Sequence, residues 1–104
     1  MNGPVMHPAQ RITRDISVLS ATLPIPGFGV LPVNSYVINS SQPVLVDTGL
    51  AALEQRFLAE LGKIIDPVDL RWIWITHADA DHLGNLAAVL AAAPQARVVT
   101  TYLG

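Results

Sequence analysis

Residues 75–85 read ITHADADHLGN, and four side chains in this stretch are of types that bind metal ions: His77, Asp79, Asp81 and His82. In an extended segment, side chains two positions apart project to the same side, so His77, Asp79 and Asp81 are expected to converge. We expect His82 to approach the same space as the chain turns into a helix. Imidazole and carboxylate together suit zinc, iron or manganese, and two pairs of ligands could serve two ions. The stretch therefore predicts a metal site.

Helix capping offers a second explanation for the acidic residues. Asp81 is a good helix N-cap, and Asp79 would be favoured by the helix dipole near a helix N-terminus. Capping gives no reason for the two histidines, and four such side chains at this density are costly unless a cation neutralises them. Asp47, in the stretch LVDTG, could cap a turn or could hold the metal-binding loop by a hydrogen bond, and both roles remain open.

Composition limits the kinds of partner and site. The chain has 104 residues, of which 51% are apolar and 13% charged, with a formal charge of −2 and no cysteine. Any metal site must therefore use imidazole and oxygen ligands. Neither the charge balance nor the short apolar runs indicate a nucleic-acid partner or a membrane span, and we expect a cytoplasmic protein. The apolar excess suggests that some surface meets a second half-domain or another copy of the chain.

Hydrophobic periodicity predicts an α/β layer arrangement behind a leader. Residues 1–13 are expected to be a disordered leader, with His7 exposed to solvent, and residues 14–104 a partial domain. The strand at residues 72–75 is continuously apolar, so we expect both of its faces to be covered. The remaining expected elements are a strand within 14–23, a Pro- and Gly-rich loop at 24–32, a hairpin of strands 34–39 and 43–47, a helix from 50 that stops at Gly62, a helix at 83–93 and a strand at 96–101.

The chain resembles the metallo-β-lactamase fold superfamily, whose signature is His-x-His-x-Asp-His. The stretches NSYVI, PVLVDTG, DPVDLRWIWITH and DHLGN occur in the family's usual order. The resemblance implies an αββα sandwich, of which this chain is the N-terminal αβ half. It implies two zinc ions that activate water, with His77 in the first metal site and Asp81 and His82 in the second. Asp81 is also expected to act in catalysis, and Asp47 would correspond to the aspartate of the first motif.

Two departures from the family pattern affect these expectations. Asp79 stands where the commonest signature has histidine, and a carboxylate favours a harder cation, so iron and manganese remain open beside zinc. The family's di-iron branch, similar to flavodiiron proteins, has glutamate there. Residues 83–104 contain no His, Asp, Glu or Cys, so the later ligands of the complete fold are not among them. A second half-domain or self-association is expected to complete the site.

The function implied by the resemblance is metal-dependent hydrolysis of a small-molecule ester, thioester, lactone or phosphodiester by metal-activated water. One alternative is a di-iron redox protein similar to flavodiiron proteins. Another is a non-catalytic half-domain. Bound zinc with hydrolysis, a coupled iron pair, and no stable metal would distinguish the three.

Overall fold

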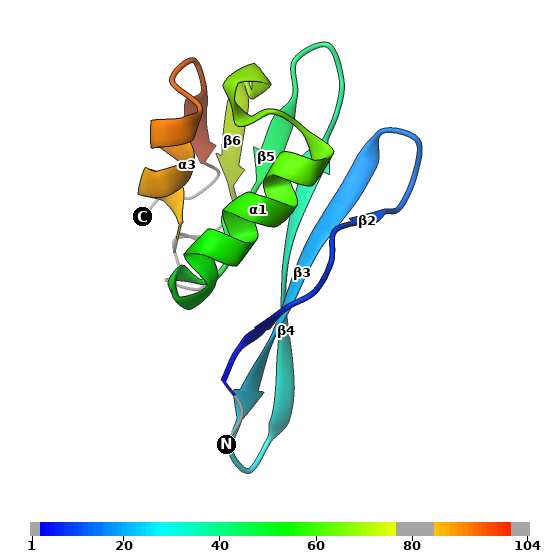
Figure 1. Cartoon of the computed structure of the whole chain (residues 1–104), viewed down its shortest axis with the longest axis vertical. Coiled ribbons are helices and arrows are strands. Elements are labelled where there is room, and N and C mark those ends of the chain that lie inside the picture. The colour runs from blue at the N-terminus through cyan, green and yellow to red at the C-terminus, as the bar shows by residue number, and fades with distance from the viewer. Residues whose placement is uncertain (1–2, 77–84, 101–104) are drawn as a thin grey trace.

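The computed structural model describes residues 3–76 and 85–100, which form one mixed sheet with helices on one face (Figure 1). The sheet has seven strands in the order β1-β3-β4-β5-β6-β7, and β2 also pairs with β3. The strands are β1 (Val5–Met6), β2 (Gln10–Arg11), β3 (Ile16–Ile25), β4 (Gly29–Ile38), β5 (Val44–Val46), β6 (Trp72–Ile75) and β7 (Arg97–Thr100). The helices are α1 (Glu54–Ile64) and α3 (Leu86–Ala92), with short 3-10 turns at Ala51–Leu53 and Pro67–Asp69.

The order of the elements agrees with the predicted order. Along the sheet, strand pairing changes from antiparallel to parallel at β5. The predicted hairpin is present, because β4 and β5 pair antiparallel with Tyr36 opposite Val46. From β5 onwards the strands are parallel, and Val46 lies opposite Trp74. The carboxyl ends of β5, β6 and β7 therefore meet at one edge of the sheet, the edge at which α/β folds usually place their ligands.

The β3–β4 hairpin is longer than the sequence predicts. Residues 24–32 were expected to form a loop, but the two strands pair up to Ile25 opposite Gly29, and their tip projects beyond the other strands (Figure 1). Pro24 and Pro32 lie within this paired stretch but beyond the parts of β3 and β4 that pair with β1 and β5, so each has one strand neighbour and not two in the described structure. The tight turn needs Gly27, whose φ is +83°.

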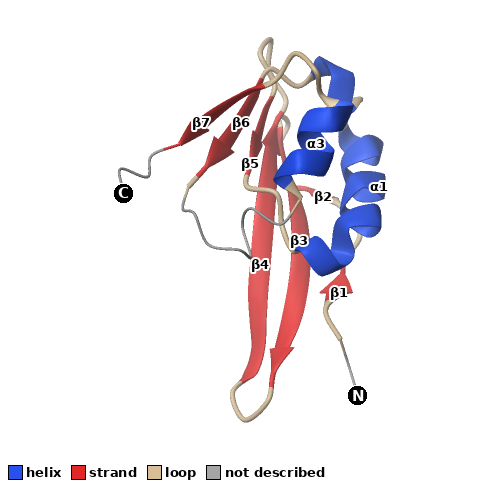
Figure 2. Ribbon diagram, turned by 90° about the vertical axis from the view of Figure 1, so that its left-hand side faces the viewer, coloured by secondary structure: helices blue, strands red, loops and turns tan. Residues whose placement is uncertain are grey.

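One apolar core lies between the sheet and the two helices, which cover the same face (Figure 2). Phe57 and Leu61 of α1 and Val89 of α3 are fully buried against the sheet. α1 does not stop at Gly62 as predicted but continues to Ile64, because a helix tolerates an interior glycine at a cost of about 1 kcal/mol. Within the described ranges, no helix is long and apolar enough to cross a membrane.

The opposite face of β6 and β7 is exposed in the described part of the chain. The expectation that β6 is covered on both faces is wrong for these residues: Ile73 and Ile75 are buried, whereas Trp74 is 39% exposed. Val99 of β7 pairs with Trp74 and shares its face, and it is 44% exposed. The cause is that both described helices pack on one face. Continuous apolar character in β6 thus corresponds to alternating burial.

The expectation of a disordered leader is corrected for residues 3–13. β1 and β2 both pair antiparallel with β3, and Met6 is buried in the core. His7 is half-buried, and its Nε2 lies 3.2 Å from Thr22 Oγ1. The leader also contacts α1, because the Ala9 N–H donates to the carboxylate of Glu60 at 2.7 Å. Two-residue strands carry almost no periodic signal, so local patterns could not predict this pairing.

Glu60 makes stability depend on pH in a definite direction. The hydrogen bond from Lys63, with that from the Ala9 N–H, lowers the pKa of Glu60 from its ordinary value of 4.5. The stabilisation is therefore present above pH 4.5 and is lost as the pH falls through the folded-state pKa. We expect Glu60→Gln to be less stable than the unaltered protein at neutral pH, with the difference shrinking in acid. Urea denaturation at several pH values measures it, and a difference that grows in acid would contradict the assignment.

Gly27 and Gly49 form a matched pair for testing the packing of α1. Both have left-handed backbones, with φ of +83° and +72°, so alanine at either costs about 1–2 kcal/mol in strain. A Cβ at Gly27 meets nothing within 4 Å, whereas one at Gly49 would lie 3.0 Å from Phe57 Cδ1. We expect Gly49→Ala to reduce the free energy of unfolding clearly more than Gly27→Ala. Equal losses in the free energy of unfolding, measured by chemical denaturation, would show that the Phe57 ring moves aside without cost.

Candidate metal centre

The four predicted ligands, His77, Asp79, Asp81 and His82, lie outside the described residues. The structure does describe the residues on both sides of this segment. Thr76 follows β6 at the carboxyl edge of the sheet, and Asn85 precedes α3. The candidate centre is therefore located through the contacts that Thr76 and Asn85 make.

Asp47 holds the residue that precedes His77. It comes directly after β5, and its carboxylate accepts two hydrogen bonds from Thr76, one from the backbone N–H at 3.0 Å and one from Oγ1 at 2.8 Å. Its own N–H donates to the carbonyl of Trp74 at 2.9 Å. Asp47 is buried and has a φ of +63°, a left-handed conformation that aspartate tolerates better than most residues. The carboxylate thus joins the ends of β5 and β6.

Thr48, the next residue, holds the other side of the segment. Its Oγ1 accepts a hydrogen bond from the backbone N–H of Asn85 at 3.3 Å. The Asn85 side-chain amide donates to the carbonyls of Thr48 at 2.8 Å and Leu50 at 3.0 Å. Thr48 and Asn85 are both fully buried. Two consecutive residues after β5 therefore bind the two residues that flank positions 77–84.

The orientation of the Asn85 amide follows from its partners. Two carbonyl oxygens can be satisfied only by the NH₂ group, so Oδ1 must be on the other side. This Oδ1 is buried and has no hydrogen-bond partner in the described structure. A buried acceptor without a donor costs about 1–3 kcal/mol. The neighbourhood of Asn85 thus holds an acceptor that a donor would stabilise.

Buried polar side chains gather at this edge of the sheet. Ser35 precedes Tyr36, which pairs with Val46 at the end of β5, and the Ser35 hydroxyl is also buried without a partner in the described part of the chain. The buried polar and charged residues of the described ranges are Ser35, Asp47, Thr48 and Asn85. An apolar core has no structural need for four such groups at one edge, so their position favours a functional origin.

The capping explanation does not apply to α3. Asn85 occupies the N-cap position of this helix, and its side chain makes no capping hydrogen bond. Asp81 itself lies outside the described residues, and the N-cap position of α3 belongs to Asn85. Across residues 3–76 and 85–100, no group of three or more His, Cys, Asp or Glu side chains could hold a metal ion. The ligand assignment at positions 77–82 consequently remains a prediction from the sequence.

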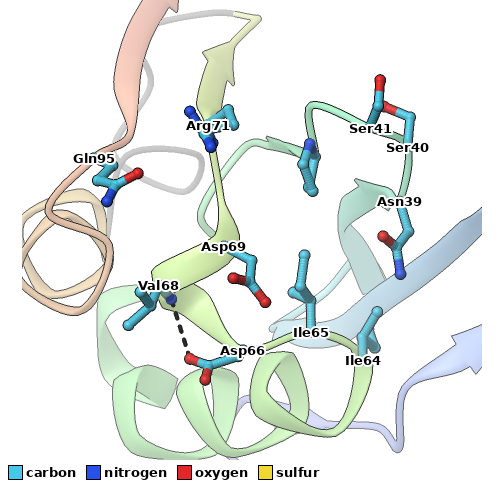
Figure 3. Close-up of a pocket in the computed structure, with 11 residues that line it drawn as sticks. Asn39, Ser40, Ser41, Ile64, Ile65, Asp66, Val68, Asp69, Arg71 and Gln95 are labelled. Carbon is cyan, nitrogen blue, oxygen red and sulfur yellow. Dashed lines mark hydrogen bonds between the residues drawn. The ribbon is translucent and has the colours of Figure 1, made fainter.

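A hollow lined by described residues lies away from this edge of the sheet (Figure 3). It has a volume of about 700 Å³ and is lined by residues that precede the parallel strands, including Pro43 before β5, Arg71 before β6 and Gln95 before β7. Asp66, also in its lining, uses its carboxylate to accept the Val68 N–H at 3.1 Å and cap a short helical turn. This hollow is thus at the amino ends of β5 to β7, away from Asp47 and Thr76.

Thr76 and Asn85 are functional candidates that the sequence did not reveal. Both lie within the quoted stretch ITHADADHLGN, but neither is a typical metal ligand. The available signals were weak: a threonine directly after a strand, and an asparagine directly before a helical stripe. Two roles were open for Asp47, and the hydrogen bond that it accepts from Thr76, the residue before His77, is the kind of contact that the supporting role needs. The role of Asp47 towards a metal stays a prediction.

Comparison with known proteins now identifies the family. The sequence model of the metallo-beta-lactamase superfamily matches residues 28–101, which is most of the chain. The chain therefore belongs to the metallo-beta-lactamase superfamily. The fold agrees: the FEZ-1 metallo-beta-lactamase of Legionella gormanii superposes with a TM-score of 0.72 at 19% identity, covering 94% of this chain and 34% of that one.

The more similar relatives are flavoproteins and a nitric oxide reductase. A flavoprotein from Thermotoga maritima has a TM-score of 0.80 at 25% identity, covering 94% of this chain and 27% of that one. The nitric oxide reductase of Moorella thermoacetica is 34% identical over 68 residues, which is 65% of this chain and 17% of that protein. A putative diflavin flavoprotein of Thermosynechococcus vestitus is 35% identical over 68 residues, 65% of this chain and 12% of that protein. The chain spans less than a fifth of these two curated relatives.

Substitution of Asp47 tests the connection between β5 and β6. Asp47→Ala removes a charged acceptor, worth about 1.5–3 kcal/mol, and places alanine in a left-handed conformation at a further cost of about 1–2 kcal/mol. Asp47→Asn keeps one oxygen and tolerates the backbone, so we expect a distinctly smaller loss. Urea denaturation of both variants gives the two free energies. Equal losses in the free energy of unfolding would show that the left-handed backbone at residue 47 adds nothing to the cost of alanine.

Proposed function

We propose that this chain is the metal-binding first half of a di-iron redox domain that reduces nitric oxide or dioxygen. The observation that carries the proposal is the donor set in the sequence, in which Asp79 supplies a carboxylate where the commonest family signature has histidine. Two carboxylates and two imidazoles form a harder, more negative set than imidazoles alone, and such a set favours iron or manganese over zinc. The named relatives support the same choice, since they include a nitric oxide reductase and a flavo-diiron protein of Clostridium acetobutylicum.

The expected zinc hydrolase is the weaker proposal. Its support is at the level of the superfamily and of the fold, which hosts several chemistries. Named relatives that exceed 30% identity carry names of redox proteins. Zinc has no redox chemistry, so a zinc site would not serve the reaction in those names. Iron accordingly replaces zinc as the proposed metal.

The described residues fit a metal centre at this edge of the sheet. Buried polar groups of the turn after β5 hold both Thr76 and Asn85, and the Asn85 Oδ1 is a buried acceptor still in need of a donor. His77, Asp79, Asp81 and His82 would hold the metal, and iron would supply one-electron redox chemistry there. Two molecules of nitric oxide, two electrons and two protons give one nitrous oxide and one water. The electrons would come from a flavin, the cofactor that the relatives' names include.

The roles of the chain's own residues follow from their contacts. Asp47 fixes the start of the ligand segment through Thr76, and Thr48 fixes its end through Asn85. Asp79 would add negative charge next to the metal and so stabilise its more highly charged form. The exposed apolar face that includes Trp74 and Val99 is the surface on which we expect a second half-domain to pack and bring the remaining ligands.

Metal preference tests the proposal. We expect the protein, expressed with iron and zinc both present, to retain iron. In Asp79→His the iron-to-zinc ratio should fall at least roughly tenfold, a difference of about 1.4 kcal/mol in relative binding free energy. Elemental analysis gives the ratio, and Mössbauer spectroscopy shows whether the iron ions are coupled.

The double variant His77→Ala/His82→Ala is the matched control and should retain neither metal. An unaltered protein that keeps zinc and hydrolyses esters would overturn the redox proposal in favour of the hydrolase. An unchanged ratio in Asp79→His would show that Asp79 is not a ligand.

A further inference from the structure

We propose that Thr48 and Asn85 are positioning residues for the predicted metal ligands at positions 77–82. They would act by fixing the residue that directly follows this segment. This inference rests on the proposed function only in requiring that residues 77–82 bind a metal, whichever metal it is. The contacts that carry it join residues 37 positions apart in the sequence.

The contact between Asn85 and the turn at residues 48–50 uses all three N–H donors of Asn85. Three hydrogen bonds connect Asn85 to residues 48–50, because its backbone N–H and both of its amide hydrogens all donate to that turn. Both side chains are buried, so water does not compete for these bonds. The first residue before α3 is thereby fixed relative to the end of β5.

The contact is not explained by the needs of α3. A residue at the N-cap position usually turns its side chain to the free N–H groups of the first helical turn. Asn85 occupies that position and instead gives its amide to the carbonyls of Thr48 and Leu50. The helix thus forgoes a capping hydrogen bond, and the turn after β5 receives two. The side chain of Asn85 therefore fixes this residue relative to the turn and does not cap the helix.

Asp47, the residue before Thr48, holds the other end of the ligand segment. Asp47 holds Thr76, and Thr48 holds Asn85, so one turn determines where the eight residues 77–84 begin and end. Fixing both ends of a segment reduces the number of conformations that it must lose when its side chains bind an ion. Groups that orient metal ligands in this way typically change metal affinity when they are removed.

Metal titration of matched variants tests the inference. Thr48→Val keeps the shape of the side chain and removes the acceptor for the Asn85 N–H, and Asn85→Ala removes both amide donors. Thr48→Ser retains the hydroxyl. Val37→Ala removes buried apolar volume from β4 without touching the turn, so it is the control for a loss of stability alone.

Each protein is titrated anaerobically with Co²⁺, whose visible absorption reports ligand geometry, and with Fe²⁺, while circular dichroism checks folding. We expect Thr48→Val and Asn85→Ala to lose roughly 10–100-fold in Co²⁺ affinity with a changed spectrum. Thr48→Ser should retain the affinity and spectrum of the unaltered protein, and Val37→Ala should retain both despite lower stability. Thr48→Val carries the test if Asn85→Ala does not fold.

Unchanged Co²⁺ affinity and spectrum in a folded Thr48→Val protein would overturn the inference, as would an equal loss in Val37→Ala. These results leave the proposed function standing if the protein still prefers iron. Preference for zinc over iron, with affinity still dependent on Thr48, refutes the redox proposal and supports the positioning role. Absence of Co²⁺ and Fe²⁺ binding by the unaltered protein refutes both.

Discussion

The carboxylate of Asp47 is the interaction on which the arrangement of this chain depends. It accepts two hydrogen bonds from Thr76 and so joins the ends of two parallel strands that are 29 residues apart in the sequence. The left-handed backbone at Asp47 redirects the chain from the sheet towards the helices. Gly49 then lets the ring of Phe57 approach the turn. Sheet edge, helix packing and the flanks of the ligand segment are thus controlled by three consecutive residues.

The parts of the fold that the sequence predicts are those with a strong local period. The apolar positions of α1 recur at helical spacing, and the segment of β6 is a compact run of aromatic and β-branched residues, so both are recognisable without knowledge of their partners. The edge strands β1 and β2 are not, because two residues carry no period and their pairing with β3 is decided by tertiary contacts. The exposure of Trp74 in the described part of β6 could not be predicted either, since a continuous apolar run does not reveal which faces are covered.

In the candidate site, too, some residues are recognisable from the sequence and others only from their tertiary contacts. Ligand-type residues are recognised by their chemistry, so His77, Asp79, Asp81 and His82 could be proposed from residue type and spacing. Asp47 remained open between a capping role and support of the metal-binding loop. Thr76 and Asn85 could not be proposed, because hydroxyl and amide side chains cap turns and helices throughout proteins. What distinguishes Thr76 and Asn85 is a buried partner at a separation of 29 and 37 residues, and no local pattern encodes that distance.

The fold does not determine the chemistry. This chain superposes comparably on a flavoprotein, with a TM-score of 0.80, and on a metallo-beta-lactamase, with a TM-score of 0.72. A frame that fixes both ends of a ligand segment does not itself select an ion, so the choice of metal depends on the ligand side chains, including those proposed within the segment. Replacing one imidazole by the carboxylate of Asp79 adds a full negative charge without requiring any change in the residues that hold the frame. Under the proposed ligand assignment, a single position would change the metal preference while the turn at Asp47 keeps its geometry.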